Sequence, residues 1–316
     1  MTNDTMTPRK VLVFGATGVI GKYILGELYN ARSSFEKIGL FTSAATAKNK
    51  SEELSSWKEK GVNVIIGDVD SEDNVNMAYN DYDTIISALG RNAILAQIPL
   101  LRLASASPTI HSFFPSEYGT DIEYAPTSAT EKPHQLKLEV RRFVRENIQD
   151  LKVTYLVTGP YSDLYFGTSP DARVGTFDVQ GKRATLLGTG QEKVSFTTMR
   201  DVGRLVVAAL KTPTTDAERI LKVNSFTTSP AHVLSEFERQ TSSQWDVTYT
   251  PLEELKKLEE DAWKEDAGLK TVFTLRRIWT EGGTLYQSRD NESIGLREGD
   301  METLESQIAK VIGKRG

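Results

Sequence analysis

Three glycines recur at three-residue spacing near the start of the chain, at Gly15, Gly18 and Gly21. They follow a short apolar run and precede a segment with helical spacing, which predicts a strand, a tight turn and a helix start. Gly15 and Gly18 would let the backbone approach a pyrophosphate, whose charge suits the amides and dipole of the helix N-terminus. The loop predicts a dinucleotide site made of Gly15, Thr17, Gly18, Val19, Ile20 and Gly21.

The end of the second predicted strand bears on which dinucleotide would bind. A site for NAD usually places Asp or Glu about 20 residues after the glycines, where it binds the ribose 2′-OH. This chain has Thr42 and Ser43 at that place and no acid. Lys48 and Lys50 follow, and a lysine there could bind a 2′-phosphate, although both also suit a solvated loop. The missing acid favours NADP(H).

Further cofactor contacts are expected where the later strands end. The carboxyl ends of parallel strands meet at one edge of the sheet, and ligands bind there. We therefore expect four more residues beside the cofactor: Asp68, Leu89, Gly90 and Gly159.

The reacting group is not one of the usual kinds. No tyrosine after the fourth predicted strand has a lysine four residues later, and the serine-hydrolase pattern GxSxG is absent. The three histidines are scattered and cysteine is missing, so we expect no metal site. Lys137 and Arg141 remain, four residues apart on one face of a predicted helix. Most helix lysines are simply solvated, so spacing alone leaves the role of Lys137 open.

The elements that would position these residues alternate along the chain. Apolar strand-like runs lie at 11–14, 38–41, 62–66, 84–87, 110–114 and 153–157, with helical segments between them. This alternation predicts an α/β fold, a doubly wound parallel Rossmann sheet. We expect residues 1–158 to form this dinucleotide-binding domain, with 194–225 returning to it. Residues 159–193 and 226–316 would form a smaller α+β substrate-binding lobe, and Asp201 is expected to be the N-cap of a helix.

The composition excludes several classes of protein. The net charge is −5 with no basic stripe, so nucleic acid is not an expected partner. No apolar run approaches the ~20 residues of a membrane span, and the polar residues 1–10 lack the apolar core of a secretory signal. We expect a cytoplasmic monomer or homodimer without a membrane partner.

Several motifs together resemble the isoflavone reductase family of NmrA-like, atypical short-chain reductases, which includes phenylcoumaran benzylic ether reductases. They are the glycine loop, Phe-Phe-Pro-Ser-Glu-Tyr-Gly at 113–119 and the Lys137/Arg141 pair. The resemblance extends to fungal CipA-like members through Glu-Tyr-Gly-Thr-Asp at 117–121, Val-Thr-Gly-Pro-Tyr at 157–161 and Leu-Arg-Arg-Ile-Trp-Thr-Glu-Gly-Gly at 275–283. It implies that Lys137 transfers a proton, that Arg141 belongs to the cofactor site and that Lys50 binds the 2′-phosphate. Plant members carry arginine at the position of Thr42.

These inferences suggest hydride transfer from NADPH to a small aromatic or conjugated secondary metabolite, phenylpropanoid-like or polyketide-like, with Lys137 as general acid or base. A dinucleotide-binding redox sensor without catalysis, or an isomerase or cyclase without net redox change, remain alternatives. Five aromatic residues are candidate walls of the substrate pocket: Tyr118, Tyr161, Tyr165, Phe166 and Trp279.

Overall fold

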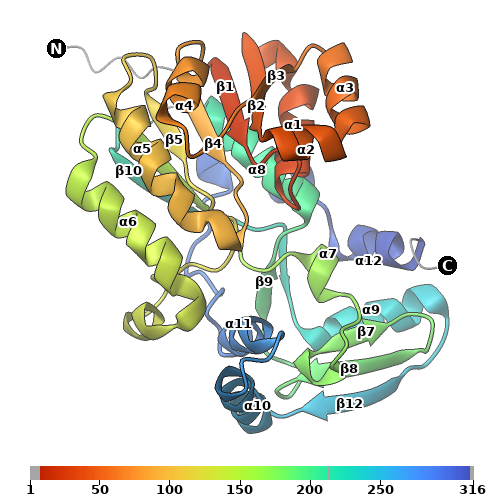
Figure 1. Cartoon of the computed structure of the whole chain (residues 1–316). Helices are drawn as coiled ribbons and strands as arrows, with labels where there is room; N and C mark the ends of the chain where they lie inside the picture. Colours follow the sequence, from red (N-terminus) through yellow and green to blue (C-terminus); the bar gives the residue numbers. More distant parts are fainter. Residues whose placement is uncertain (1–7, 213, 314–316) are drawn as a thin grey trace.

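A seven-stranded parallel sheet forms the centre of the computed structural model, which describes residues 8–212 and 214–313 (Figure 1). Its strand order is β10-β6-β5-β4-β1-β2-β3, which contains the 3-2-1-4-5-6 order of a Rossmann sheet. The doubly wound sheet predicted from the sequence is thus confirmed. The strands are β1 (Lys10–Phe14), β2 (Lys37–Thr42), β3 (Asn63–Ile66), β4 (Thr84–Ser87), β5 (Ser112–Phe114), β6 (Lys152–Val157) and β10 (Glu218–Lys222).

Apolar runs form these strands because helices cover both faces of the sheet. In β1, Val11, Leu12 and Val13 are all 0% exposed, although neighbouring side chains point to opposite faces. Helices α1, α3 and α8 pack on one face, and α4, α5 and α6 on the other. Their bounds are α1 (Gly21–Asn30), α3 (Ser51–Glu59), α8 (Met199–Lys211), α4 (Glu72–Tyr79), α5 (Gln97–Ala106) and α6 (Gln135–Asn147). The short helix α2 (Ala44–Asn49) follows β2.

The chain returns to this sheet after it has built part of a second lobe. Helix α8 packs against α1, and β10 pairs in parallel with β6 at the end of the sheet. The expected N-cap of this helix, Asp201, is wrong by one turn. The N-cap is Thr198, whose hydroxyl accepts the amide hydrogen of Asp201 at 3.1 Å. Asp201 instead lies in the first turn, where a carboxylate suits the positive end of the helix dipole.

The smaller lobe contains two short sheets with helices around them (Figure 1). One sheet has the order β12-β8-β7 and the other pairs β11 with β9. The strands are β7 (Thr176–Asp178), β8 (Arg183–Leu187), β9 (Val194–Phe196), β11 (Phe226–Thr228) and β12 (Asp246–Thr250). The helices are α7 (Ser162–Tyr165), α9 (Pro230–Thr241), α10 (Leu252–Lys264), α11 (Lys270–Thr280) and α12 (Leu304–Gly313). In the described part of the chain, no helix is both long and apolar enough to cross a membrane.

Close packing of α8 on α1 depends on a glycine. A methyl group at Gly203 would lie 2.5 Å from the main-chain oxygen of Tyr23, a distance that real contacts do not reach. Gly203 therefore allows the two helix backbones to approach each other. Since α1 follows the glycine loop, this contact also fixes the helix end that faces the proposed cofactor.

We expect Gly203→Ala to lower the free energy of unfolding by about 1–3 kcal/mol, because the added methyl group forces α8 away from α1. Gly26→Ala is the matched control in α1, since nothing lies within 4 Å of the added methyl group. It should raise the free energy of unfolding by about 0.5–1 kcal/mol through helix propensity. Urea denaturation measures both variants, and equal effects would contradict the role given to Gly203.

Candidate functional site

The glycine loop is a turn that only glycine can form at two of its positions. Gly15 has a φ of +74°, and a side chain there would lie 2.6 Å from the main-chain oxygen of Ala88. A side chain at Gly21 would lie 2.1 Å from the main-chain oxygen of Gly15. The amide of Gly18 donates to the oxygen of Gly15 at 2.9 Å and closes the turn. The turn between β1 and α1 therefore depends on glycine at positions 15 and 21.

The start of α1 suits a phosphate group. Its N-cap residue Ile20 provides no side-chain acceptor for the first amides, and its first turn contains no acidic residue. The amides of Lys22 and Tyr23 donate to the main-chain oxygens of Gly18 and Ile20, so it is the positive end of the helix dipole that would attract an anion here. Val19 is 62% exposed at the edge of the loop, whereas Thr17 and Gly18 are half-buried. These features fit the pyrophosphate of a dinucleotide.

A cation, Lys50, lies beside this loop, at the junction of α2 and α3. The Lys50 ammonium donates a hydrogen bond to the main-chain oxygen of Thr17 and is 3.8 Å from Glu53. Thr42 is buried at the end of β2, and Ser43 is the exposed N-cap of α2. The structure thus brings together the loop and Lys50, the lysine to which the family resemblance gives the 2′-phosphate.

The remaining predicted cofactor residues all lie at the carboxyl edge of the sheet. Asp68 is exposed after β3, and half-buried Leu89 and exposed Gly90 follow β4. Gly159 follows β6 with a φ of +66°, and its amide donates to the oxygen of Gly119 at 2.9 Å. They extend the line of strand ends from the glycine loop to β6.

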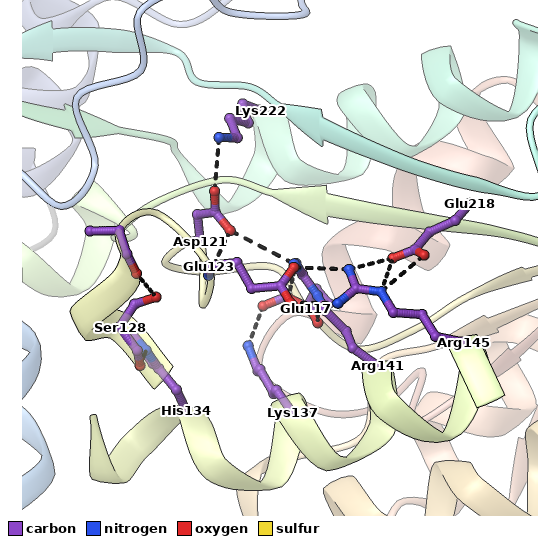
Figure 2. A network of polar contacts seen from close by, with 11 residues as sticks. Glu117, Asp121, Glu123, Ser128, His134, Lys137, Arg141, Arg145, Glu218 and Lys222 are labelled. Atoms are coloured by element: carbon purple, nitrogen blue, oxygen red, sulfur yellow. Dashed lines mark hydrogen bonds and ion pairs between the residues drawn. The ribbon is translucent and has the colours of Figure 1, made fainter. Parts of the chain in front are cut away.

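Lys137 lies in the first turn of α6 and points toward the segment that follows β5 (Figure 2). Its ammonium donates a hydrogen bond to the main-chain oxygen of Glu117, and a methyl group at Gly119 would be 3.7 Å from its Nζ. Burial lowers the pKa of Lys137 to about 8, since the attraction of Glu117 is opposed by Arg91 and Arg141. The side chain can therefore give or take a proton near neutral pH.

Arg141 lies one turn further along α6 and is fully buried. Its Nε and Nη2 each donate to a carboxylate oxygen of Glu117 at 3.0 Å, and its Nη1 donates to Glu123 at 2.6 Å. The guanidinium also stacks 4.7 Å from the centre of the Tyr155 ring. Three of the five N–H donors of the guanidinium are thus engaged by carboxylates, and the residue is 0% exposed. These contacts give Arg141 a structural role, and its expected place in the cofactor site stays a prediction.

A chain of charges continues from this ion pair (Figure 2). Glu123 also accepts two hydrogen bonds from Arg145, which in turn binds Glu218 of β10. Hydrogen bonds from Arg145 and Arg141 lower the pKa of Glu123 to about 2 in spite of its partial burial. The network therefore joins α6, the segment after β5 and the last strand of the sheet.

His134 precedes Lys137 by one helical turn and is buried. Its Nδ1 is 3.0 Å from the main-chain oxygen of Ser128, which can only accept, so Nδ1 carries the proton. Burial lowers the pKa of His134 to about 4, and the ring is neutral above that pH. Its Nε2 has no partner among the described residues.

Three of the aromatic residues predicted to line the pocket belong to or contact the segment around Gly119. The Tyr161 hydroxyl donates to the main-chain oxygen of Tyr118, and the indole N–H of Trp279 donates to Thr120 Oγ1 at 2.7 Å. Tyr118 and Thr120 flank Gly119, which is close to Lys137. Tyr161 and Trp279 are half-buried, and Tyr118 is 5% exposed.

The other two predicted wall residues are part of the core of the smaller lobe. Phe166 is 0% exposed and its ring lies 6.0 Å from Phe177 and 5.1 Å from Phe196. We therefore correct Phe166 from a pocket wall to a core residue. Tyr165 is 3% exposed and packs 4.8 Å from Phe196, with an arginine, Arg276, over its ring.

Sequence reasoning gave no role to several residues that build this site. Glu117 was part of the motif at 113–119, but its place as the partner of both Lys137 and Arg141 follows only from the fold. Buried Gln97 of α5 accepts the amide hydrogen of Ser116 at 2.7 Å and fixes the same segment. Gln97 is the first residue of α5, and no sequence signal distinguishes it from an ordinary polar residue at a helix start.

Two cavities lie away from this edge. One of about 300 Å³ is at the opposite edge of the sheet, beside Thr84, Ser112 and Arg219. Its Arg219 donates to the last carbonyls of α8, which makes it a cap of that helix. The other, of about 520 Å³, lies between Lys132 and α10 and is lined mainly by charged side chains. Neither contains the glycine loop or Lys137, and the geometry of the strand ends locates the site instead.

No group of three His, Cys, Asp or Glu side chains placed to hold a metal ion occurs within residues 8–212 and 214–313.

Comparisons with known proteins point to one family. The model of the NmrA-like family matches residues 7–305. The chain is 28% identical over 254 residues to isoflavone reductase homolog P3 of Arabidopsis thaliana, covering 78% of this chain and 80% of that protein. It is 24% identical over 251 residues to phenylcoumaran benzylic ether reductase PT1 of Pinus taeda, with 79% and 80% covered. The solved leucoanthocyanidin reductase–NADPH complex from Vitis vinifera shares the fold, with a TM-score of 0.74, 19% identity and 96% and 99% covered.

The buried ion pair predicts a large loss of stability. Arg141→Met would leave the Glu117 carboxylate, 2% exposed, without its cation, so we expect the free energy of unfolding to fall by about 3–5 kcal/mol. Arg145→Met is the control, because its side chain is 42% exposed and its loss should cost at most about 1 kcal/mol.

Urea denaturation of both variants makes the comparison. Adding Glu117→Gln to Arg141→Met should recover part of the loss, since no buried charge then remains unpaired. Similar losses of unfolding free energy for the two single variants would contradict the larger stability effect expected for the buried pair.

Proposed function

The chain belongs to the NmrA-like family, and on that premise we propose that it is an oxidoreductase that transfers a hydride from NADPH to a small aromatic or conjugated substrate. Membership confirms the resemblance drawn from the sequence motifs. The related plant proteins are named as reductases of isoflavones and of phenylcoumaran benzylic ethers. These names support a phenylpropanoid-like substrate class.

The observation that carries this proposal is the placement of Lys137. Its ammonium is held at the carboxyl edge of the sheet by the main-chain oxygen of Glu117. Burial lowers its pKa to about 8, which suits a group that must give up a proton near neutral pH. A redox sensor needs no such group, so the lysine favours an enzyme.

The glycine loop fits the cofactor for a separate reason. Side chains at Gly15 and Gly21 would collide with the backbone, so the tight turn before α1 requires glycine at both positions. The loop would hold the pyrophosphate, and Lys50 with Ser43 would hold the 2′-phosphate. When bound, NADPH supplies the hydride.

The protein itself would then donate a proton to the substrate and hold the donor group in place. As the substrate carbon gains the hydride, the neighbouring substrate oxygen gains a proton from Nζ of Lys137, which becomes a neutral amine. Arg141 and Glu117 do not touch the substrate in this scheme. They hold α6 and the segment after β5 so that Nζ stays in place.

We expect Lys137→Met to reduce turnover by at least about 10²-fold while NADPH binding changes little, because the proton donor is lost and the glycine loop is intact. NADPH oxidation with a panel of conjugated ketones and benzylic ethers measures turnover, and quenching of tryptophan fluorescence measures binding. Lys58→Met, at an exposed lysine of α3, is the control. Unchanged turnover in Lys137→Met would contradict the assignment.

The same experiment separates the alternatives. A wild-type protein that binds NADPH but oxidises none of it with any compound would be a sensor. Conversion of a compound without NADPH consumption would indicate an isomerase or cyclase.

The pH dependence has a defined sign. Reduction needs the protonated form of Lys137, which is lost as the pH rises through about 8. We therefore expect kcat to be level below pH 7 and to fall about tenfold per pH unit above 8. His134 contributes no transition in this range, because burial lowers its pKa to about 4. A kcat that rises through pH 8 would show that Lys137 acts as a base in the limiting step.

A further inference from the structure

Arg276 is a buried cation whose charge is not neutralised within the described structure. It lies in α11, is 7% exposed and takes part in no ion pair among the described residues. Its Nη2 donates to the main-chain oxygen of Tyr165 at 3.4 Å, a long hydrogen bond. Its Nη1 is buried and has no partner among those residues. Burial of an uncompensated charge is strongly unfavourable, so this arrangement calls for an explanation.

The other arginines inside the protein show how unusual this is. Arg277, the next residue along α11, contacts the carboxylates of Glu131, Glu259 and Glu281 at 2.6, 2.5 and 2.8 Å. Arg141 binds two carboxylates. Glutamates thus neutralise Arg141 and Arg277, whereas Arg276 has no carboxylate partner among the described residues.

Aromatic rings compensate only part of the charge of Arg276. Its guanidinium lies 3.5 Å from the centre of the Tyr165 ring and 5.7 Å from that of Trp279. Such contacts are weaker than a charge-assisted hydrogen bond to a carboxylate. The Tyr165 hydroxyl cannot act as the missing anion, because burial raises its pKa and keeps it neutral.

The position of Arg276 links it to the proposed catalytic lysine. Trp279, one turn later in α11, donates its indole hydrogen to Thr120 at the carboxyl end of β5. Thr120 follows Gly119, and a methyl group at Gly119 would be 3.7 Å from Nζ of Lys137. A series of contacts through Trp279 and Thr120 therefore connects Arg276 with the residues beside Lys137.

We propose that Arg276 binds an anionic group of the substrate, a carboxylate on an aromatic or conjugated acid. This inference rests on the proposed function, because it places a charged group of the reduced molecule near Lys137. The free Nη1 and weakly bonded Nη2 give a carboxylate the paired donors that an arginine fork provides. The Tyr165 ring, 3.5 Å from the guanidinium, holds the arginine in place for this contact.

Direct binding tests the proposal without turnover. Protein loaded with NADP⁺ is titrated by calorimetry with 4-hydroxycinnamate and with its methyl ester, which has the same ring but no charge. The wild type should bind the acid about tenfold more tightly than the ester, as expected for one charged hydrogen-bonded pair. Arg276→Gln should bind the two equally. Arg142→Gln, at an exposed arginine of α6, should keep the wild-type preference and controls for net charge.

The outcomes separate this proposal from the proposed function. Equal binding of acid and ester by the wild type, or a preference that survives in Arg276→Gln, would overturn the role of Arg276. An Arg276-dependent preference in a protein that never oxidises NADPH would leave this site in place and remove the reductase.

Folding of the variant is checked in the absence of ligand. Arg276→Met removes an unpaired buried charge, so its melting temperature should not be lower than that of the wild type. A clear drop would assign Arg276 a structural role and contradict the proposal.

Discussion

The buried ion pair between Arg141 and Glu117 is the constraint on which the rest of the site depends. It joins α6 to the segment after β5 through two parallel hydrogen bonds of 3.0 Å, in a place that water does not reach. Lys137 lies one turn earlier on the same helix and binds the main chain of the same glutamate. Any rotation of α6 would therefore break the pair and displace the lysine together. Burying these two charges costs desolvation free energy, and what the pair provides in return is a fixed position for Lys137.

The topology supplies the other half of the arrangement. Contacts run along the strand ends in an unbroken series: Lys50 to Thr17, Gly15 beside Ala88, Ser116 to the oxygen of Leu89, and Gly159 to Gly119. A parallel sheet brings these loops to one edge whatever their separation in the chain. The anion-binding turn and the proton donor are thus neighbours because the strands β1 and β5 are separated only by β4.

The fold was predictable because strands buried on both faces are apolar throughout, as in β1, and because a turn like that at Gly15 requires glycine. The face shared by Lys137 and Arg141 was also readable from helical spacing. The partner of that face could not be predicted, since Glu117 is 24 residues from Arg141 in the chain. Strand β10 was missed because Glu218–Lys222 is an edge strand with charged ends.

Thr198 and Asp201 both have side chains that suit a helix N-cap, and the local sequence does not decide between them. Whether Phe166 lines a pocket or a core depends on packing between distant segments.

The late return of the chain to its first sheet has a consequence for synthesis on the ribosome. Strand β6 is covered at its outer edge only by β10, and α8 is the last of the helices to cover the face of the sheet that α1 and α3 also cover. A nascent chain that has emerged as far as residue 158 therefore carries an open strand edge and an apolar face that is only partly covered. Translation must proceed by at least another 60 residues or so before that half can close, which makes a pause in this interval a point of risk for aggregation and a natural site for chaperone binding.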